Sequence, residues 1–319
     1  MRAVTFAAGQ ISVEDQPDPI PGPGEVLVRV HAAGLNAADL MQVRGLYPAP
    51  PGVPAGIPGL ELAGEVVALG EGATRFRLGD RVMSLVGGGA QAELAVTDER
   101  VALPVPPAMG WEAAGGFPEA FTTAHDALVT QCALRRGERF LVTGAAGGVG
   151  TAAVQIGAAI GAAVVASVRD PARRAAVAEL GAAVIDPSEA EGHGPYDVAL
   201  ELVGGESFAA SFRALATGGR MAVIGVAAGT HVELDLLALM GRRARVMGST
   251  LRSRSAEEKA LAARGVEADL LPLVEAGRLR VVVGAVVDLE SAPDAYAQFR
   301  AGGKLGKIVL ATNAPATGS

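Results

Sequence analysis

Residues 140–151 read FLVTGAAGGVGT, and this stretch limits the fold of the 319-residue chain more than any other. An apolar run meets a cluster of glycines, and an alanine-rich segment then continues to Ile160. This order predicts a β-strand, a tight turn and an α-helix. Glycines let the backbone turn sharply and approach a ligand, and the first N–H groups of a helix attract phosphate. The stretch therefore predicts a pyrophosphate site for a dinucleotide.

The glycine pattern is incomplete. The usual GxGxxG needs glycine where this chain has Ala145, so on this motif alone an ordinary strand–helix turn stays open as an alternative. A P-loop is excluded, because GxxxxGK[ST] requires a lysine and none lies between Arg139 and Lys259.

A charge-free run of 28 residues, from Leu141 to Val168, is long enough to cross a bilayer. It is full of Gly and Ala and contains polar residues such as Thr143 and Gln155. A buried strand–helix–strand unit explains it better, because strands and helix of a parallel sheet are covered on all sides. The N-terminus also lacks the apolar core of a signal peptide, so no membrane partner is expected.

Composition narrows the class of protein further. With 50% hydrophobic and 19% charged residues, the chain is globular and long enough for two domains. A net charge of −7 argues against nucleic acid as a partner. The single cysteine, Cys132, excludes an internal disulfide and a multi-cysteine metal site. It fits a reducing cytoplasm, which is the expected location.

The two halves of the chain differ in pattern. In 25–31 (EVLVRVH), valines alternate with other residues after a PGPG turn, as in a half-buried strand. A short helix is expected at 37–43 and a stiff proline-rich loop at 47–58. Beyond 119, apolar runs alternate with helical patterns, which predicts a doubly wound parallel sheet. Further strands are expected at 62–69, 81–86, 90–96, 164–168, 197–202, 220–226, 244–247, 281–287 and 307–310, and further helices at 120–129, 173–180 and 256–275.

The end of the second predicted strand bears on the choice of cofactor. NAD-binding units usually place an acid there for the ribose 2′-OH, but here the strand ends at Ser167 and Arg169 and Arg173 follow. Arginine suits a 2′-phosphate, because its guanidinium makes charge-assisted, often bidentate hydrogen bonds. We therefore expect NADPH rather than NADH. The alternative is that Arg173 and Arg174 only solvate a helix face.

Six segments carry a family resemblance, and they span nearly the whole chain in order. They are AAGLNAADLMQVRGLYPAPPG (32–52), PGLELAGEVVALG (58–70), GDRV (79–82), TGAAGGVGTAAVQ (143–155), GSTLRSR (248–254) and GKIVL (306–310). On these segments the chain resembles the zinc-independent quinone oxidoreductases of the medium-chain dehydrogenase/reductase superfamily. More narrowly, it is similar to the subgroup that contains the p53-inducible quinone oxidoreductase. The resemblance also accounts for Ala145, because this family commonly replaces the first glycine of GxGxxG.

The resemblance implies a GroES-like β-barrel catalytic domain with an inserted Rossmann cofactor domain. Residues 1–118 would form the N-terminal part of the catalytic domain and 119–253 the NADPH-binding domain. Residues 254–319 would return to complete the catalytic domain. The resemblance also implies a homodimer in which the cofactor-domain sheets of two subunits join at their edges.

The resemblance further implies roles for individual residues. Asn36 and Tyr47 are expected beside the nicotinamide and the substrate. The cofactor-binding residues that it implies are Thr123, Gly147, Gly148, Val149, Ser167, Arg169, Arg173, Gly225, Val226 and Leu251. Lys304 is also assigned to the cofactor site. It stands where this subgroup is expected to have Asn, so the resemblance does not define its role there.

No metal is expected in this chain. A catalytic zinc needs three protein ligands, usually Cys, His or Glu. The zinc-dependent relatives have Cys where this chain has Asn36, and GHE where it has Gly59-Leu60-Glu61. Leu60 cannot bind a metal, and Glu61 is expected to be a buried structural carboxylate.

The resulting hypothesis is an NADPH-dependent reduction of quinones or related electron-poor enones by hydride transfer, without zinc. In the absence of a metal, a hydrogen-bond donor must stabilise the charge that develops on the substrate, and Tyr47 is the first candidate. Two alternatives stay open: a 2-enoyl thioester reductase of the same fold, and a non-enzymatic dinucleotide-binding protein for redox sensing. The loop 47–58 contains no Lys or Arg, which argues against a long acyl-carrier substrate.

Overall fold

The computed structural model describes residues 1–312. The chain divides into two compact units, one formed by Met1–Thr122 with Leu251–Ser319 and the other by Thr123–Thr250. The expected domain boundaries, after 118 and after 253, lie a few residues from these divisions. The sequence also predicts disorder in the last few residues, and this prediction falls on a segment outside the described range.

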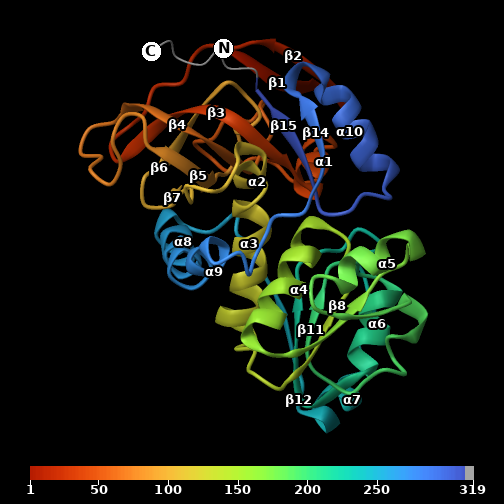
Figure 1. The fold of residues 1–319 in the computed structure, drawn as a ribbon. Helices are drawn as coiled ribbons and strands as arrows, with labels where there is room; N and C mark the ends of the chain where they lie inside the picture. Colours follow the sequence, from red (N-terminus) through yellow and green to blue (C-terminus); the bar gives the residue numbers. More distant parts are fainter. Residues whose placement is uncertain (313–319) are drawn as a thin grey trace. The chain divides into compact units, whose positions relative to one another are not determined.

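The first unit is built on a seven-stranded sheet in the order β14-β15-β3-β4-β5-β7, with β6 paired to β3, and on a separate hairpin of β1 and β2 (Figure 1). All pairs are antiparallel except β14 with β15. Because β15 pairs with β3, the C-terminal segment completes the N-terminal sheet. The strands are β1 (Arg2–Ala7), β2 (Gln10–Asp15), β3 (Glu25–Leu35), β4 (Glu61–Leu69), β5 (Arg81–Leu85), β6 (Leu94–Asp98), β7 (Leu103–Pro104), β14 (Val283–Asp288) and β15 (Lys307–Ala311).

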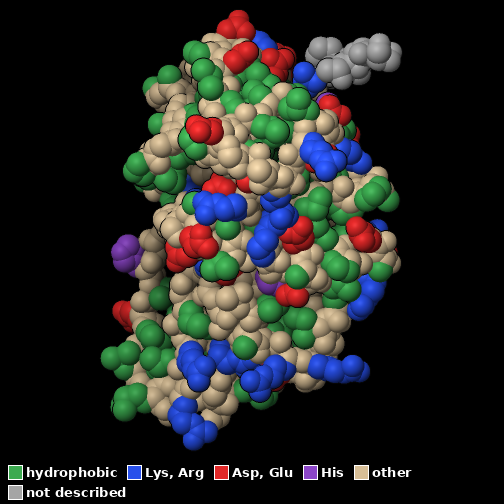
Figure 2. Space-filling view, turned by 90° about the vertical axis from the view of Figure 1, so that its left-hand side faces the viewer, with side chains coloured by type: hydrophobic (Ala, Val, Ile, Leu, Met, Phe, Trp, Pro, Cys, Tyr) green, Lys and Arg blue, Asp and Glu red, His purple; other side chains and the backbone are tan. Residues whose placement is uncertain are grey.

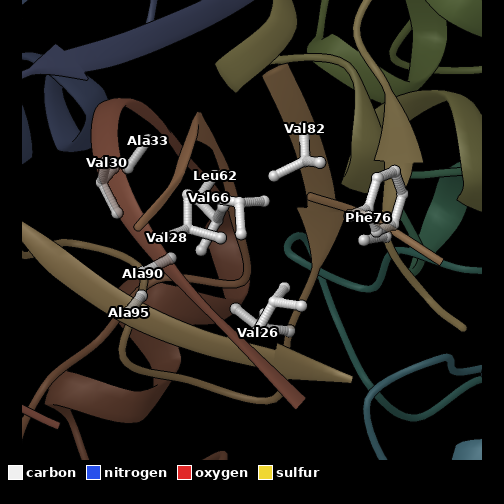
Figure 3. Close-up of a cluster of buried hydrophobic side chains, with 12 residues drawn as sticks. Val26, Val28, Val30, Ala33, Leu62, Val66, Phe76, Val82, Ala90 and Ala95 are labelled. Atoms are coloured by element: carbon white, nitrogen blue, oxygen red, sulfur yellow. The ribbon is translucent and has the colours of Figure 1, made fainter. Parts of the chain in front are cut away.

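The core of this unit follows from the alternation seen in β3. Val26, Val28 and Val30 are fully buried. They point toward side chains of β4 and β5 such as Leu62 and Val82 (Figure 3). Burying a valine or leucine side chain contributes about 1.5–3 kcal/mol, so this cluster is the main source of stability for the sheet. The helices of the unit are α1 (Ala37–Val43), α2 (Trp111–Gly115), α8 (Ala256–Asp269), α9 (Leu271–Glu275) and α10 (Ala292–Ala301), with a 3-10 turn, η3 (Leu289–Ser291).

The second unit is a six-stranded, fully parallel sheet in the order β10-β9-β8-β11-β12-β13, with helices connecting the strands (Figure 1). This order confirms the doubly wound sheet. Its strands are β8 (Arg139–Val142), β9 (Ala163–Ser167), β10 (Ala183–Ile185), β11 (Tyr196–Glu201), β12 (Leu215–Val223) and β13 (Arg245–Gly248). Its helices are α4 (Gly148–Ile160), α5 (Pro171–Ala178), α6 (Glu206–Arg213) and α7 (Leu236–Arg242), with a 3-10 turn, η2 (Pro187–Glu189).

The boundary between the units falls inside α3 (Pro118–His125). A single helix was expected at 120–129, but α3 is followed by a π-helical turn, η1 (Asp126–Gln131). The sequence also left several elements unpredicted, among them the strands β1, β2, β7 and β10 and the helices α2 and α10. Each of these is short or lacks a clean apolar period, so packing rather than local pattern decides it.

Within residues 1–312, no helix is both long enough and apolar enough to span a membrane. On the face drawn in Figure 2, Lys and Arg side chains stand in groups that acidic and apolar side chains separate.

Candidate functional site

The glycine turn of the second unit lies at the carboxyl end of β8, where the order of the sheet reverses between β8 and β11. Gly144 adopts a φ of +58°, and the N–H of Gly147 donates to its carbonyl at 3.0 Å. A Cβ on Gly150 would lie 2.5 Å from Gly144 O and 2.6 Å from the Cα of Ala145, so only glycine fits there. Ligands of doubly wound sheets bind at such a switch point.

The start of α4 suits an anion. Its N-cap is Gly147, no side chain caps the helix, and no acidic residue stands in the first turn. The N–H groups of Gly148 and Val149 have no intrahelical acceptor at this end, and the helix dipole favours negative charge. The three predicted pyrophosphate residues thus form a site whose chemistry fits a dinucleotide phosphate.

Two arginines follow Ser167, the last residue of β9, and both stay partly open to solvent. Arg169 is exposed. Arg173 lies 3.5 Å from the carboxylate of Asp170, and its side chain is 40% exposed. Arg174 differs, because it pairs with Asp186 at 2.5 Å and donates to Val168 O at 3.1 Å. Arg174 therefore stabilises the local fold, whereas the side chains of Arg169 and Arg173 are the more solvent-accessible of the arginines after β9.

A buried carboxylate, Glu201, organises the end of β11. Its Oε1 accepts hydrogen bonds from the Thr143 hydroxyl at 3.0 Å and from the N–H groups of Val203 and Gly204 at 2.9 Å each. Its Oε2 accepts from the hydroxyls of Ser207 at 3.2 Å and Ser211 at 3.1 Å. All five donors are neutral, so hydrogen bonds alone stabilise this charge and fix the loop after β11.

Three further predicted cofactor residues belong to the same unit. Gly225 follows β12, and its N–H donates to the carbonyl of Glu201 at 3.2 Å. A Cβ on Gly225 would lie 2.4 Å from Leu202 O, so the backbone there packs tightly against the loop after β11. Val226 is half-buried beside it, and Thr123 is 7% exposed in α3. The cofactor roles of all three stay predictions.

The first unit contains a buried ion pair that the sequence did not reveal. The Lys307 ammonium lies 2.5 Å from Glu61 Oε1 and donates to Asn36 Oδ1 at 2.6 Å and to Leu35 O at 3.2 Å. Asn36 in turn donates through Nδ2 to Glu61 Oε1 at 3.0 Å. Lys307 comes from β15 and Glu61 from β4, so the return of the C-terminal segment brings them together. Both polar ends of the Asn36 amide are therefore engaged within the protein.

Two more carboxyl groups lie near this pair. Asp39, on α1, accepts from the N–H groups of Asn36 at 2.7 Å and Gly59 at 3.1 Å, and burial raises its pKa to about 7. Glu119, on α3, donates its N–H to Glu61 Oε2 at 2.8 Å. Burial, together with the negative charge of Glu61, raises the pKa of the Glu119 carboxyl to about 8.

Tyr47 is half-buried, and Arg252 holds its segment in place. Arg252 donates to Tyr47 O at 2.8 Å and to Gly87 O at 2.8 Å, and its guanidinium carbon lies 4.9 Å from the centre of the Tyr47 ring. It also donates to Gln42, whose amide bonds to Ala55 O at 3.1 Å. Burial lowers the pKa of Arg252. The loop 47–58 thus has an arginine against it, supplied from 205 residues away.

The two remaining predicted cofactor residues also belong to the first unit. Leu251 is buried against Leu85 and Val101. The Lys304 ammonium donates to Gly306 O at 3.0 Å and lies 4.4 Å from the centre of the Phe299 ring. Burial lowers the pKa of Lys304 to about 8. Their contribution to a cofactor site stays a prediction.

Four functional candidates escaped the sequence analysis: Glu119, Glu201, Arg252 and Lys307. Lys307 and Arg252 lie in two of the segments that carried the family resemblance. Their position in these shared motifs is the sequence feature that could have identified them as functional candidates. Within residues 1–312, no cluster of three or more His, Cys, Asp or Glu side chains suits a metal ion.

Comparison with known proteins gives two family matches. Residues 22–133 match the alcohol dehydrogenase GroES-like domain, and 148–266 match the zinc-binding dehydrogenase family. The chain is 30% identical over 305 residues to the quinone oxidoreductase of Rattus norvegicus, covering 92% of this chain and 90% of that protein. It is 36% identical over 293 residues to the polyketide synthase GfsB of Streptomyces halstedii, covering 90% of this chain but spanning only 5% of that protein.

A solved structure of a mycobacterial protein complexed with NADPH superimposes with a TM-score of 0.87 at 28% identity, covering 98% of this chain and 100% of that one. The matches agree with the mostly antiparallel sheet of the first unit and the parallel sheet of the second. From its fold, its family matches and its near full-length similarity to quinone oxidoreductases, the chain belongs to the medium-chain dehydrogenase/reductase superfamily of oxidoreductases.

Proposed function

We propose that this protein is an NADPH-dependent reductase of quinones or related electron-poor enones and that it works without zinc. The observation that carries the proposal is the uncapped start of α4 beside the turn at Gly144, followed by two solvent-accessible arginines after β9. Similarity to quinone oxidoreductases supports the substrate class. A bound nicotinamide would supply the hydride.

The choice of NADPH rests on Arg169 and Arg173. Their guanidinium groups would pair with the 2′-phosphate, and the similar mycobacterial protein is complexed with NADPH. Replacing both by alanine should raise the KM for NADPH at least about tenfold and leave the KM for NADH nearly unchanged, because each lost charge-assisted hydrogen bond costs about 1.5–3 kcal/mol. Arg174→Ala is the matched control. Equal effects on both cofactors would remove the 2′-phosphate assignment.

On the substrate side, Tyr47 is proposed to donate a hydrogen bond to the oxygen on which charge develops. Arg252 fixes the segment that carries it. Tyr47→Phe removes only the hydroxyl and should lower kcat by about tenfold or more. An unchanged kcat in this variant would exclude the donor role.

Zinc independence is supported by the surroundings of Glu61. Its two carboxylate oxygens already accept from Lys307, Asn36 and the N–H of Glu119. The purified protein should therefore contain no stoichiometric zinc by elemental analysis, and dialysis against a chelator should leave quinone reduction unchanged. Loss of activity on chelation, restored by zinc, would contradict this part of the proposal.

A second candidate function is the reduction of 2-enoyl thioesters. Similarity to a segment of a polyketide synthase favours it. A panel of quinones, simple enones and 2-enoyl thioesters, assayed with both nicotinamides, would separate the two. A kcat/KM at least tenfold higher for the thioesters would replace the quinone assignment, and tight NADPH binding without any turnover would favour a redox-sensing protein.

We also propose a cytoplasmic homodimer joined along β13. This strand is at the end of the sheet order, and the neighbouring α7 exposes Leu236, Leu237 and Met240 to the extent of 64%, 79% and 69%. A second copy would cover both the open strand edge and these apolar side chains. Light scattering should give the mass of a dimer, and Leu237→Asp should shift it to that of a monomer.

A further inference from the structure

Glu201, at the end of β11 in the second unit, is 0% exposed to solvent. Its five hydrogen-bond donors come from the end of β8, from the loop after β11 and from α6. Taking a carboxylate out of water is costly, and replacing hydrogen-bonded polar partners by apolar groups of the same shape can be nearly neutral for stability. The stability of the sheet alone therefore does not account for this side chain.

The loop after β11 has a backbone that neither a strand nor a helix can supply. Gly204 and Gly205 follow each other with φ values of +81° and +56°, a region that favours glycine. The N–H groups of Val203 and Gly204 both donate to Glu201 Oε1, at 2.9 Å each. Glu201 therefore sets the conformation of the residues 202–205.

This loop lies against the glycine turn that precedes α4. A Cβ on Gly144 would lie 3.3 Å from Val203 Cγ2 and 3.5 Å from Leu202 Cβ, so both side chains reach the turn. The Thr143 hydroxyl donates to Glu201 Oε1 at 3.0 Å and accepts from the N–H of Leu202 at 2.8 Å. Glu201 thus connects the loop after β11 to the turn in which the pyrophosphate is proposed to bind.

The same loop also lies against the segment after β12. Gly204 forms a parallel bridge with Gly229, and the N–H of Ala228 donates to Val203 O at 2.8 Å. Because β12 pairs with β11, the two segments leave the same edge of the sheet. The carboxyl ends of β8, β11 and β12 are therefore joined through the residues that Glu201 holds.

The two sides of the switch point differ in chemistry. On the β9 side, the side chains of Arg169 and Arg173 are partly open to solvent. On the β11 side, the loop 202–205 has no charged residue, and its Leu202 and Val203 are half-buried. A doubly wound dinucleotide fold binds one mononucleotide on each side of the switch point. The arginines suit the phosphorylated adenosine half, and the uncharged side suits the nicotinamide half, whose reduced ring carries no charge.

We infer that Glu201 is a positioning residue for the nicotinamide half of the dinucleotide, and this inference rests on the proposed function. Glu201 is fully buried, so it acts through the loop 202–205 and not by touching the cofactor. A loop that is ordered before binding removes the cost of ordering it when the ligand arrives. Loss of the Glu201 hydrogen bonds should therefore weaken the binding of one half of the cofactor and not of the other.

The decisive variant is Glu201→Gln, which keeps the size of the side chain but turns an NH₂ group toward N–H and O–H donors. By calorimetry, its Kd for NADPH should be about tenfold higher than that of the wild type, and its Kd for 2′,5′-ADP should stay within about twofold. The fragment 2′,5′-ADP carries the adenosine half with its 2′-phosphate and lacks nicotinamide. The variant Arg169→Ala, Arg173→Ala should instead weaken the binding of both ligands.

Further variants separate positioning from a general loss of stability. Thr143→Val removes one donor to Oε1 and the acceptor for Leu202, so it should share the selective loss of NADPH affinity. The variant Ser207→Ala, Ser211→Ala removes only the donors to Oε2. It should lower the Tm and leave the Kd of both ligands unchanged. Glu206→Gln, at the exposed start of α6, is the matched control for the lost charge and should behave as the wild type.

The outcomes separate the inference from the function on which it rests. If Glu201→Gln binds NADPH as tightly as the wild type does, or if it loses the same factor for NADPH and for 2′,5′-ADP, the positioning role is wrong. If the wild type binds NADPH but reduces neither quinones nor enones, only the proposed reaction fails, and the two Kd values still decide the role of Glu201. If the wild type binds neither NADPH nor NADH, both proposals fail.

Discussion

Each unit buries carboxyl groups at its polar centre, but the two units stabilise them by different means. Glu201 in the second unit is surrounded by five neutral donors, four of them within ten residues of it in sequence. Glu61 in the first unit depends on the ammonium of Lys307, which the chain supplies only near its end. The Glu201 carboxylate is therefore stabilised by hydrogen bonds, mostly from residues close to it in sequence. The Glu61 carboxylate depends instead on an ion pair with a residue far away in sequence.

This difference predicts how each unit responds to a lost partner. Removing one neutral donor leaves Glu201 with four others, whereas removing the Lys307 ammonium leaves the buried carboxylate of Glu61 with two neutral donors and without its ion-pair partner. It also assigns different tasks to the two centres. The hydrogen bonds of Glu201 fix the loop at the carboxyl ends of the strands, and burial beside the charge of Glu61 raises the pKa of the Glu119 carboxyl to about 8.

The largest expected effect is that of Lys307→Met. The free energy of unfolding should fall by about 3–5 kcal/mol, because the variant leaves Glu61 buried and unpaired. Denaturant unfolding measures this loss. The double variant Glu61→Gln, Lys307→Met should recover part of it, since no lone charge remains. A loss below about 1 kcal/mol in the single variant would show that the pair is not what balances the charge there.

Gly150→Ala tests the local character of the second unit. The added Cβ would meet backbone atoms of Gly144 and Ala145 at 2.5–2.6 Å, which side-chain movement cannot relieve. We expect the free energy of unfolding to fall by about 3 kcal/mol. We also expect a weaker affinity for NADPH, and calorimetry would measure both quantities. Gly241→Ala, in α7 with open space around it, is the matched control and should be neutral or stabilising. If the two variants had the same free energy of unfolding and the same affinity for NADPH, the close packing of the turn would be contradicted.

Glu201→Gln should lower the free energy of unfolding by about 2 kcal/mol, which is less than the decrease expected for Lys307→Met. The new NH₂ group would face donors rather than acceptors, so some of the hydrogen bonds are lost but no buried charge is stranded. The loop after β11 should loosen, which hydrogen exchange at Val203 and Gly204 would detect. Ser207→Ala removes a single donor and should cost about 1 kcal/mol or less. If Glu201→Gln lowered the free energy of unfolding more than Lys307→Met does, the second unit and not the first would be the more sensitive to changes at its buried carboxylate.

The smallest expected effect is a gain in stability. The pKa of Glu119 rises from 4.5 in its ordinary state to about 8 in the fold, so folding takes up a proton between these values. The wild type should therefore lose stability as the pH rises from about 5 to about 8, and Glu119→Gln should lose less. At pH about 8 the Tm of the variant should exceed that of the wild type by about 2–4 °C. A lower Tm in the variant would indicate that Glu119 is ionised and paired.

Much of the fold was predictable, because its signals are local. The alternation in 25–31 gave β3, the helix at 37–43 was predicted with the bounds that α1 has, and the glycine turn located β8 and α4. The strand at 164–168 was placed within one residue of β9. In each case neighbouring residues share one face or one turn, so a period or a glycine cluster identifies them.

The candidate site was predictable to different degrees in the two units. The glycine turn, Ser167 and the arginines after it could be located from the sequence, since they stand at fixed positions after their strands, and their cofactor roles stay predictions. Arg173 and Arg174 looked equivalent in sequence, and only the ion pair with Asp186 separated their roles. The loop 47–58 lacks basic residues of its own, yet Arg252 is packed against it.

What the sequence determined by itself is therefore the order of the elements, the parallel sheet and the position of the dinucleotide turn. These depend on interactions between residues that are close along the chain. The tertiary structure decided the charge balance of the first unit: Lys307 meets Asn36 across 271 residues, and Arg252 meets Gln42 across 210. A buried charge acts on whatever lies near it in space, and sequence spacing does not encode that neighbourhood. For this reason the raised pKa of Glu119 could be inferred only from the folded chain.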